Sequence, residues 1–440
     1  MNADQPIWLS TAPAAPRGDG PLAGIRFGVK DNIDVTGLPT TAACPDLADR
    51  VAERSATAVR LLVEAGAVVA GKTNMDQFAT GLVGTRSPYG ACHAVDSAAH
   101  ISGGSSSGSA IAVAGGEVAL ALGTDTAGSG RVPAAFNGLV GAKPTRGLVS
   151  TAGVLPACRS LDCVTTFTRT VREARAALDV LVAFDPADPW SRPMPPRPPA
   201  GVAAEARVLA VPDGPLDLGR EHTTAWKLAL AHAATVARLV PVDIEPFLAA
   251  GKLLYGGPWV AERWAGFGHL LGGPSVDPTV RRIVAAGRDI AGPDVFAALD
   301  ALAALRRATE PVFAGADALL LPTTPVHPTL AEVAADPVGV NARLGTYTTF
   351  VNLLDLCAIA VPAGRRADGL PFGVQLIGPA FADPMLIDLA ARWCGEPATA
   401  PGVPTGHLLL AVSHSPLSAE ELLNRARKHA QQAEVLGYVA

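Results

Sequence analysis

Short apolar stretches with the two-residue period of a β-strand alternate along this chain with stretches that have the period of a helix. Residues 25–30 have the strand period and end at Lys30, whereas residues 55–65 have apolar side chains at helical spacing and stop at Gly66. Further helices are predicted around 221–240, 245–265, 279–287 and 294–311, and further strands at 67–70, 318–321, 358–362 and 373–377. This alternation predicts an α/β protein with a largely parallel or mixed sheet.

The charge balance excludes two large classes of protein. The 440 residues include 35 basic and 40 acidic side chains, which gives a net charge of −5. A protein whose main task is to bind nucleic acid or an anionic membrane needs a broad basic face, and this composition does not provide one. Because 49% of the residues are hydrophobic and only 17% are charged, we expect a protein with a large folded core. We expect that it binds neither nucleic acid nor a membrane.

The cysteines and the N-terminus indicate the compartment. The six cysteines are spread from Cys44 to Cys394 without a CxxC pair, so neither a zinc site nor a disulfide framework is predicted. The first 20 residues have no basic segment followed by an apolar one, and the most apolar stretch, residues 110–123, is short and contains Glu117. We expect a cytoplasmic protein with reduced thiols, without a metal or another cofactor.

One motif in the first hundred residues is misleading. Residues 66–73, GAVVAGKT, satisfy the phosphate-binding pattern GxxxxGK[ST]. That pattern binds phosphate only when a strand precedes the glycine loop and a helix follows it. Here a predicted helix precedes the first glycine, and the would-be loop is the β-prone sequence AVVA. Lys72 is therefore expected at the end of a strand and not in a nucleotide site.

Composition also suggests where the domain begins and ends. Residues 1–21 are rich in Pro, Ala and Gly and are predicted to be a loose lead-in. Residues 185–200 contain seven prolines, so they are expected to form an extended connection that crosses the domain without dividing it. The composition shifts again after residue 395, and residues 396–440 end in a polar amphipathic segment that is predicted to be an appended helix. We expect one catalytic domain over residues 22–395.

Three polar features stand in otherwise apolar surroundings. They are Lys30 at the end of a strand, the serine cluster SGGSSSGS at 102–109, and the sequence GTDTAGSGR at 123–131. A serine becomes a nucleophile only when a base takes its proton. The chain has no GxSxG nucleophile elbow and no histidine in a comparable glycine-rich setting, so a Ser-His-Asp site is poorly supported. A lysine that burial keeps neutral can be the base, which favours a Ser-Lys site.

The order GVKD, GGSSSGS, GTDTAGSGR resembles the amidase signature family of Ser-Ser-Lys hydrolases, over residues 22 to 395. The resemblance implies the amidase signature fold, which is a mixed β-sheet core covered by helices on both faces. It also implies acyl transfer, with Ser129 as the nucleophile, Ser105 as the bridging serine on a cis peptide with Gly104, and Lys30 as the base. It also implies an oxyanion hole made by the amides of Thr126, Ala127, Gly128 and Ser129. We interpret Asp125 and Arg131 as a structural ion pair that holds the loop, and Gly104 as further structural support.

The substrate has to be inferred from the second half of the chain. The sequence from Tyr255 to Arg263 resembles the allophanate hydrolase branch of that family, in which a Tyr and an Arg eight residues apart bind the substrate carboxylate. A guanidinium suits a small amide that has a carboxylate. The resemblance implies release of ammonia from allophanate, a homodimer, and urea carboxylase as a functional partner. The tail 396–440 would then be a truncated remnant of that branch's second domain.

Other functions stay open from the sequence. The chain could be a general amidase for small amides, an enzyme acting on carboxybiuret, or the glutaminase subunit of a tRNA-dependent amidotransferase. A degenerate, non-catalytic subunit is the alternative outside the enzymes, although Lys30, Ser105 and Ser129 are all present and count against it.

Overall fold

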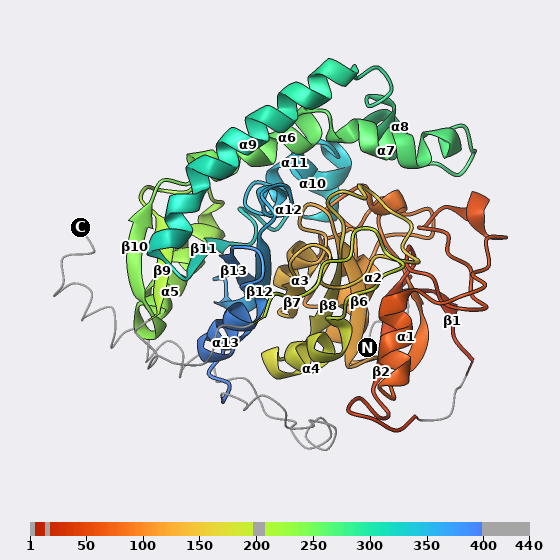
Figure 1. Ribbon diagram of the computed structural model, residues 1–440, viewed down its shortest axis with the longest axis horizontal. Helices are drawn as coiled ribbons and strands as arrows, with labels where there is room; N and C mark the ends of the chain where they lie inside the picture. The colour runs from red at the N-terminus through yellow and green to blue at the C-terminus, as the bar shows by residue number, and fades with distance from the viewer. Residues whose placement is uncertain (1–4, 14–17, 197–206, 398–440) are drawn as a thin grey trace.

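An 11-stranded mixed sheet runs through the computed structural model, which describes residues 5–13, 18–196 and 207–397 (Figure 1). The strand order is β1-β3-β2-β6-β8-β7-β12-β13-β11-β9-β10. The bounds of the strands are β1 Trp8–Thr11, β2 Arg26–Lys30, β3 Val68–Thr73, β6 Leu120–Asp125, β7 Val140–Lys143, β8 Cys163–Thr168, β9 Val208–Pro212, β10 Arg238–Val242, β11 Ala318–Pro322, β12 Cys357–Arg365 and β13 Pro371–Gly378.

In the N-terminal half of the sheet, strands β2 and β6 end close to each other. β2 lies between β3 and β6 and is parallel to both. Because parallel strands end at the same edge of a sheet, Lys30 at the end of β2 and Asp125 at the end of β6 lie at one edge. β8 then pairs antiparallel with both β6 and β7, which makes the sheet mixed.

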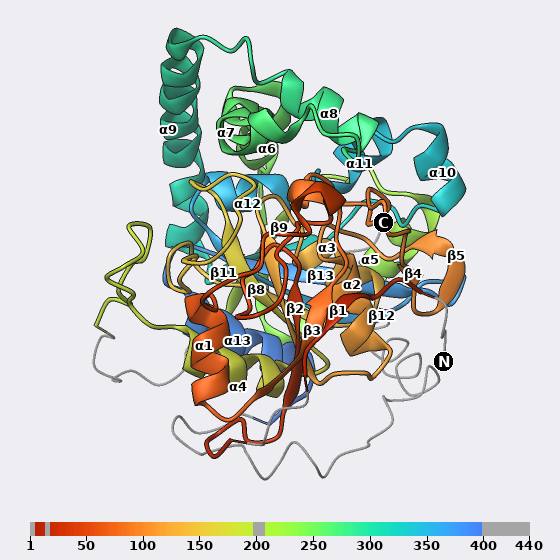
Figure 2. The same ribbon diagram turned by 90° about the vertical axis from the view of Figure 1, so that its right-hand side faces the viewer.

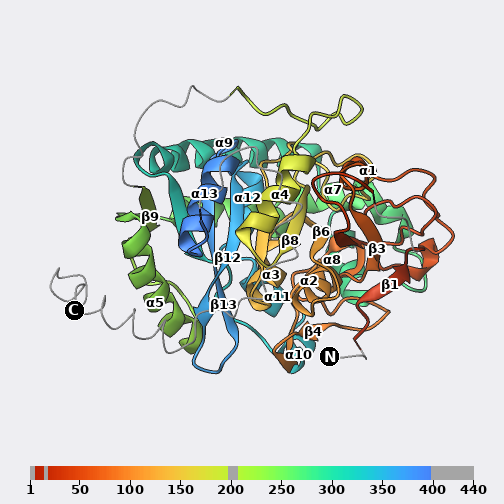
Figure 3. The same ribbon diagram turned by 90° about the horizontal axis from the view of Figure 1, so that it is seen from below.

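Helices cover both faces of the sheet. On one face lie α1 (Thr57–Glu64), α4 (Val171–Leu181), α5 (Arg220–Val236) and α13 (Asp383–Trp393), and Figure 3 shows α4 and α13 side by side. On the other face lie α2 (Ser107–Ala114), α3 (Arg131–Phe136) and α12 (Thr349–Leu353). Successive side chains of a strand point to opposite faces of the sheet. Leu320 accordingly packs in one hydrophobic cluster, and Leu319 and Leu321 pack in another.

An outer group of helices lies beyond α12, along the top of Figure 1. It consists of α6 (Glu245–Gly256), α7 (Trp259–Phe267), α8 (Pro278–Ala285) and the long α9 (Gly292–Gly315), which stands at the edge of the molecule in Figure 2. The remaining elements are the hairpin of β4 (His93–Ala94) and β5 (Ser97–Ile101), the helices α10 (Leu330–Ala335) and α11 (Gly339–Leu344), and short 3₁₀ turns at 45–47, 77–79 and 268–270. No helix among the described residues is long and apolar enough to cross a membrane.

The α/β class and the helices on both faces are confirmed, and most predicted elements occur close to their predicted bounds. Two helix predictions were too long. The helix expected over 221–240 ends at Val236, and strand β10 follows it. The helix expected over 245–265 is two helices, because Gly256, Gly257 and Pro258 interrupt the hydrogen-bonding pattern between α6 and α7.

The prediction of a loose lead-in over residues 1–21 was wrong for part of that range. Trp8–Thr11 forms β1, which pairs antiparallel with β3 at the edge of the sheet. Ile7 beside it is buried, and the indole of Trp8 donates to Glu117 at 2.6 Å. The surrounding Pro, Ala and Gly residues hid a five-residue sequence, IWLST, that is itself β-prone.

The phosphate-binding pattern at 66–73 does not have the required order of elements. Lys72 lies inside β3, completely buried, and its amine is 3.4 Å from Asp31. The helix expected in the tail lies outside the described residues, as do residues 197–206 and thus the end of the proline-rich stretch. The limits of the catalytic domain at residues 22 and 395 stay a prediction.

Candidate active site

Lys30 lies at the end of β2, and its amine contacts the neighbouring strand and the serine cluster. The amine nitrogen Nζ is 2.7 Å from Ser105 Oγ, 2.8 Å from Thr124 Oγ1 and 3.4 Å from the Thr124 carbonyl oxygen. Asn32 donates to Thr124 Oγ1 at 3.3 Å, which fixes that hydroxyl from the other side. The side chain of Lys30 is 0% exposed, so these contacts take the place of water.

The environment of Lys30 favours the neutral amine. Burial lowers its pKa from 10.5 to about 7, and Arg263 acts in the same direction. The charges of Asp76, Asp162 and Asp125 oppose this effect. At neutral pH a large fraction of Lys30 is therefore unprotonated, with a lone pair that can accept a proton from Ser105.

The serine cluster has two separate tasks. Ser105 faces Lys30, and the peptide bond between Gly104 and Ser105 is cis. Ser106 and Ser109 instead hold the start of α2 against β6: Ser106 Oγ donates to the Thr124 carbonyl at 3.2 Å, and Ser109 Oγ donates to the Leu122 carbonyl at 2.9 Å. The abundance of serine between 102 and 109 thus has a structural cause as well as a chemical one.

Ser129 lies in the turn between β6 and α3. Its hydroxyl donates to the carbonyl oxygen of Gly81 at 3.3 Å. In this state the hydroxyl therefore faces the segment that follows the 3₁₀ turn Gln77–Ala79, and Ser105 faces Lys30. The three residues predicted as catalytic converge at one edge of the sheet, on β2, before α2 and after β6.

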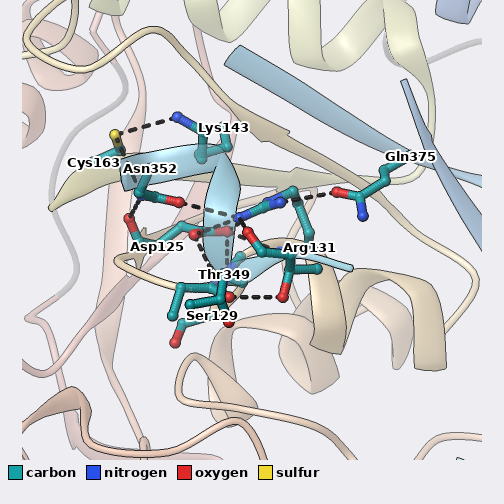
Figure 4. A network of polar contacts seen from close by, with 12 residues as sticks. Asp125, Ser129, Arg131, Lys143, Cys163, Thr349, Asn352 and Gln375 are labelled. Carbon is teal, nitrogen blue, oxygen red and sulfur yellow. Dashed lines mark hydrogen bonds and ion pairs between the residues drawn. The ribbon is translucent and has the colours of Figure 1, made fainter. Parts of the chain in front are cut away.

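Asp125 and Arg131 form the expected ion pair, completely buried beneath the Ser129 turn (Figure 4). Arg131 donates to the two carboxylate oxygens of Asp125 at 2.9 and 3.0 Å. It also donates to Gln375 at 2.8 Å and to Asn352 at 3.2 Å. Burial opposes ionisation of Asp125, but the charge and hydrogen bonds of Arg131 outweigh it and hold the pKa of that carboxyl below its ordinary value.

The same carboxylate changes the predicted oxyanion hole. The amide of Gly128 donates to Asp125 Oδ1 at 2.7 Å, so this predicted donor is already occupied. The amides of Thr126, Ala127 and Ser129 make no hydrogen bond within the described part of the chain. The turn is braced from α12, because Thr348 donates to the carbonyl of Ala127 at 2.7 Å. Three of the four predicted donors remain available for a negatively charged oxygen.

Arg263 is a buried side chain on α7. It donates to Thr80 Oγ1 at 3.0 Å and, at a longer 3.4 Å, to the hydroxyl of Tyr255 on α6. Among the described residues no carboxylate lies within ion-pair distance of it, although its side chain is among the largest that are fully buried. Because a buried charge is expensive without a counterion, this guanidinium is suited to bind an anionic group.

A loop from the first half of the chain fixes the position of α7. Glu262, next to Arg263, accepts from the amide and the hydroxyl of Ser160 at 2.7 and 2.6 Å. In the same loop, Asp162 accepts from the hydroxyl of Thr126 at 2.5 Å, beside the candidate oxyanion donors. Residues 160–162 therefore join the helix that carries Arg263 to the turn that carries Ser129.

The anion-binding candidate and the nucleophile candidate contact neighbouring residues of one short segment. Arg263 contacts Thr80, and Ser129 contacts Gly81, the next residue. The segment of Thr80 and Gly81 therefore connects the candidate anion-binding group to the candidate nucleophile.

Sequence reasoning missed three residues of the site. Thr124 lies within the GTDTAGSGR sequence, and its place on the strand parallel to β2 could have indicated that it meets Lys30. Thr80 and Gly81 have no motif that distinguishes them, because their role depends on where Arg263 and Ser129 arrive in space.

Comparison with known proteins gives consistent relatives. The family model described as Amidase matches residues 9–215 and 275–387. The urea amidolyase of Lachancea kluyveri is 47% identical over 379 residues, which are 85% of this chain and 21% of that protein. The A subunit of the glutamyl-tRNA(Gln) amidotransferase of Natronomonas pharaonis is 37% identical over 84% of this chain and 95% of that protein.

A solved structure extends the comparison. The S177A form of Kluyveromyces lactis allophanate hydrolase has a TM-score of 0.84 and 43% identity, over 89% of this chain and 66% of that one. The chain spans only about a fifth of the length of the urea amidolyases that it matches.

Proposed function

This chain belongs to the amidase signature family, and on that premise we propose that it hydrolyses a small linear amide with Ser129 as the nucleophile. The observation that carries the proposal is the 2.7 Å contact between the buried amine of Lys30 and Ser105 Oγ. A buried lysine of lowered pKa, hydrogen-bonded to a serine, has the properties of a general base. Each step below uses groups of the chain itself, so we expect no cofactor.

The reaction begins with a proton relay. Neutral Lys30 accepts the proton of Ser105, and Ser105 accepts that of Ser129 once the Ser129 hydroxyl has turned away from the Gly81 carbonyl. Ser129 Oγ then attacks the amide carbon, and the same relay returns the proton to the leaving nitrogen. Ammonia departs, and water hydrolyses the acyl-enzyme by the same route. The oxyanion that forms on attack is stabilised by the free amides of Thr126, Ala127 and Ser129.

We propose allophanate, which is urea-1-carboxylate, as the substrate, and thus the activity EC 3.5.1.54. Its carboxylate would bind to Arg263, with the hydroxyl of Tyr255 beside it, while its terminal amide faces Ser129. The buried guanidinium of Arg263, which has no carboxylate partner in the described part of the chain, supports this assignment. The relatives named urea amidolyase and allophanate hydrolase, at 43–47% identity, support it independently.

A second candidate function has one specific observation in its favour. The A subunit of the glutamyl-tRNA(Gln) amidotransferase of Natronomonas pharaonis is 37% identical to this chain over 84% of it. Glutamine also has a carboxylate and a terminal amide, but three carbons separate the two, in contrast to allophanate. Because Arg263 and Ser129 contact the adjacent residues Thr80 and Gly81, we favour the smaller molecule.

The wider setting follows from the same proposal. We propose that a urea carboxylase supplies the allophanate, that the enzyme acts in the cytoplasm, and that it is a homodimer. Residues 22–395 would be the catalytic domain. Light scattering on the purified full chain tests the dimer.

One assay separates the candidate functions. Ammonia release is measured from allophanate, from glutamine, and from malonamide, which is a small amide without a carboxylate. We expect the highest kcat/KM for allophanate. A preference for glutamine would favour the amidotransferase function, and a preference for malonamide would favour a general amidase. No turnover of any of them would support a degenerate, non-catalytic protein.

A further inference from the structure

Asp76 is a completely buried carboxylate beside the site that the mechanism above does not use. It follows β3, and its two oxygens accept main-chain hydrogen bonds from the next turn: Oδ2 from the amide of Gly84 at 3.0 Å, and Oδ1 from the amide of Arg86 at 2.9 Å. These two bonds fix the turn that begins at Gly81, whose carbonyl accepts from Ser129.

Asp76 also contacts the segments of both catalytic serines. A Cβ atom at Gly104 would lie 2.2 Å from Asp76 Oδ2, and one at Gly81 would lie 2.5 Å from the same oxygen, so only glycine fits at both positions. The main-chain amide of Asp76 donates to the carbonyl of Ser105 at 3.0 Å. Asp76 therefore packs against the residue before Ser105 and against the residue that accepts from Ser129.

The charge of Asp76 acts on the third catalytic group. The charged groups that face Lys30 are Asp76, Asp162, Asp125 and Arg263, and Asp76 has the largest effect among them, raising the pKa of Lys30. Burial raises the pKa of Asp76 itself. The charge of Arg86 and the hydrogen bonds from the amides of Gly84 and Arg86 oppose this increase. Since both of its oxygens face main-chain donors, the arrangement suits the ionised carboxylate.

We propose that Asp76 is a positioning residue of the amide hydrolysis, which holds Ser105 and the Gly81 carbonyl around Ser129 and whose charge adjusts the basicity of Lys30. The proposal rests on the proposed function, because it takes Lys30 to be the base. Its chemical reason is that the base must also return a proton to the leaving nitrogen, so its ammonium form must not be too unstable. The negative charge at Asp76 offsets part of the effect of burial.

The variant Asp76→Asn tests the proposal because it keeps the shape and removes the charge. We expect the pKa of Lys30 to fall by about one unit, and the acid limb of the pH profile of kcat/KM to move to lower pH by the same amount. We also expect a lower kcat, because the introduced side-chain NH₂ group would face one of the two main-chain N–H groups. A purely structural role would lower kcat without moving the limb.

The pKa of Lys30 can be measured whether or not the variant is active. The chain has only six lysines, so NMR of ¹³C-labelled lysine gives few signals, and loss of one in Lys30→Met assigns the signal of Lys30. The matched control is Asp383→Asn, a second buried aspartate that accepts from a main-chain amide, that of Thr145 at 2.7 Å, and that is not among the charges acting on Lys30. It should lower Tm without changing the pKa of Lys30.

The outcomes separate this proposal from the proposed function. An unchanged or higher pKa of Lys30 in folded Asp76→Asn would overturn the role of Asp76, whatever the activity. If instead the acid limb of the unmodified enzyme does not follow the measured pKa of Lys30, the assignment of Lys30 as base fails. Asp76→Ser removes the charge with a smaller side chain and should shift the pKa in the same direction. Failure of both variants to fold, while Asp383→Asn folds, would assign Asp76 to folding alone and overturn the proposal.

Discussion

The segments that the family model matches and the segment between them contribute different parts of the candidate site. Residues 9–215 contain Lys30, Ser105 and Ser129, whereas residues 216–274, which the model omits, contain Tyr255 and Arg263. Lys30 lies on strand β2 of the central sheet, Ser105 lies shortly before helix α2, and Ser129 lies shortly after strand β6. The last two lie on α6 and α7, in the outer group of helices (Figure 1).

This difference suggests a division of labour. A proton relay requires contacts near 2.7 Å, and neighbouring strands of one sheet hold such contacts rigidly. Selection of a substrate requires only that a charged group is placed at a suitable distance from the nucleophile, and helices packed outside the sheet can do this. Substitutions of Lys30, Ser105 or Ser129 should therefore affect every amide. Substitutions of Tyr255 or Arg263 should affect only amides with a carboxylate.

The largest expected effect is that of Ser129→Ala. We expect it to lower turnover of both allophanate and malonamide by about 10⁴-fold or more, because it removes the atom that forms the acyl-enzyme. Lys30→Ala should come close to this, since it removes the base. Ser109→Ala is the control within the serine cluster: its hydroxyl donates to the Leu122 carbonyl and should be dispensable for turnover. Substantial activity of Ser129→Ala or Lys30→Ala would show that the relay is assigned to the wrong residues.

Arg263→Ala should separate the two kinds of amide. Truncating one partner of a buried charge pair costs about 2–5 kcal/mol, so we expect KM for allophanate to rise by roughly 100-fold. KM for malonamide should stay within about twofold, because that substrate has no carboxylate to lose. Arg282→Ala, on the exposed side of α8, is the matched control and should change neither value. An unchanged KM for allophanate would remove Arg263 from the binding site.

The pH dependence should be shared by all substrates, because it belongs to the relay. Lys30 must be neutral to accept a proton, and its pKa is lowered from 10.5 to about 7. We therefore expect kcat/KM for both allophanate and malonamide to be constant above that pH and to fall about tenfold per unit below it. Allophanate is assayed at each pH with a correction for its spontaneous decomposition. If only allophanate shows an acid limb, the titrating group belongs to the binding of its carboxylate and not to the proton relay.

The two regions also differ in how far the sequence could predict them. Lys30, Ser105 and Ser129 each stand in a distinctive glycine-rich or strand-end setting, and their convergence follows from the parallel pairing of β2 and β6. The occupied amide of Gly128 could not be predicted, because it depends on the side-chain orientation of Asp125 within the turn. The expectation of four oxyanion donors therefore had to be reduced to three.

The burial of Arg263 could not be predicted from the sequence either, for a different reason. The helix pattern predicts α7, but which of its residues face inward depends on the contact of Glu262 with Ser160, about a hundred positions earlier. The break between α6 and α7 at Gly256 to Pro258 changes the direction of the chain as well, and a single long helix was expected there. Long-range packing of this kind leaves little local signal, in contrast to the alternation that predicted the sheet.

The smallest expected effect is that of Tyr255→Phe, and it tests whether the tyrosine belongs to the substrate or to Arg263. The hydroxyl is 3.4 Å from the Arg263 guanidinium, which is long for a hydrogen bond, so its loss should cost about 1 kcal/mol and raise KM for allophanate about fivefold. Malonamide is the internal control and should not respond. If Tyr255 only orients Arg263, the same substitution in Arg263→Ala should have no further effect on KM. If the hydroxyl binds the carboxylate itself, the fivefold effect should persist there, since the two groups would then act independently.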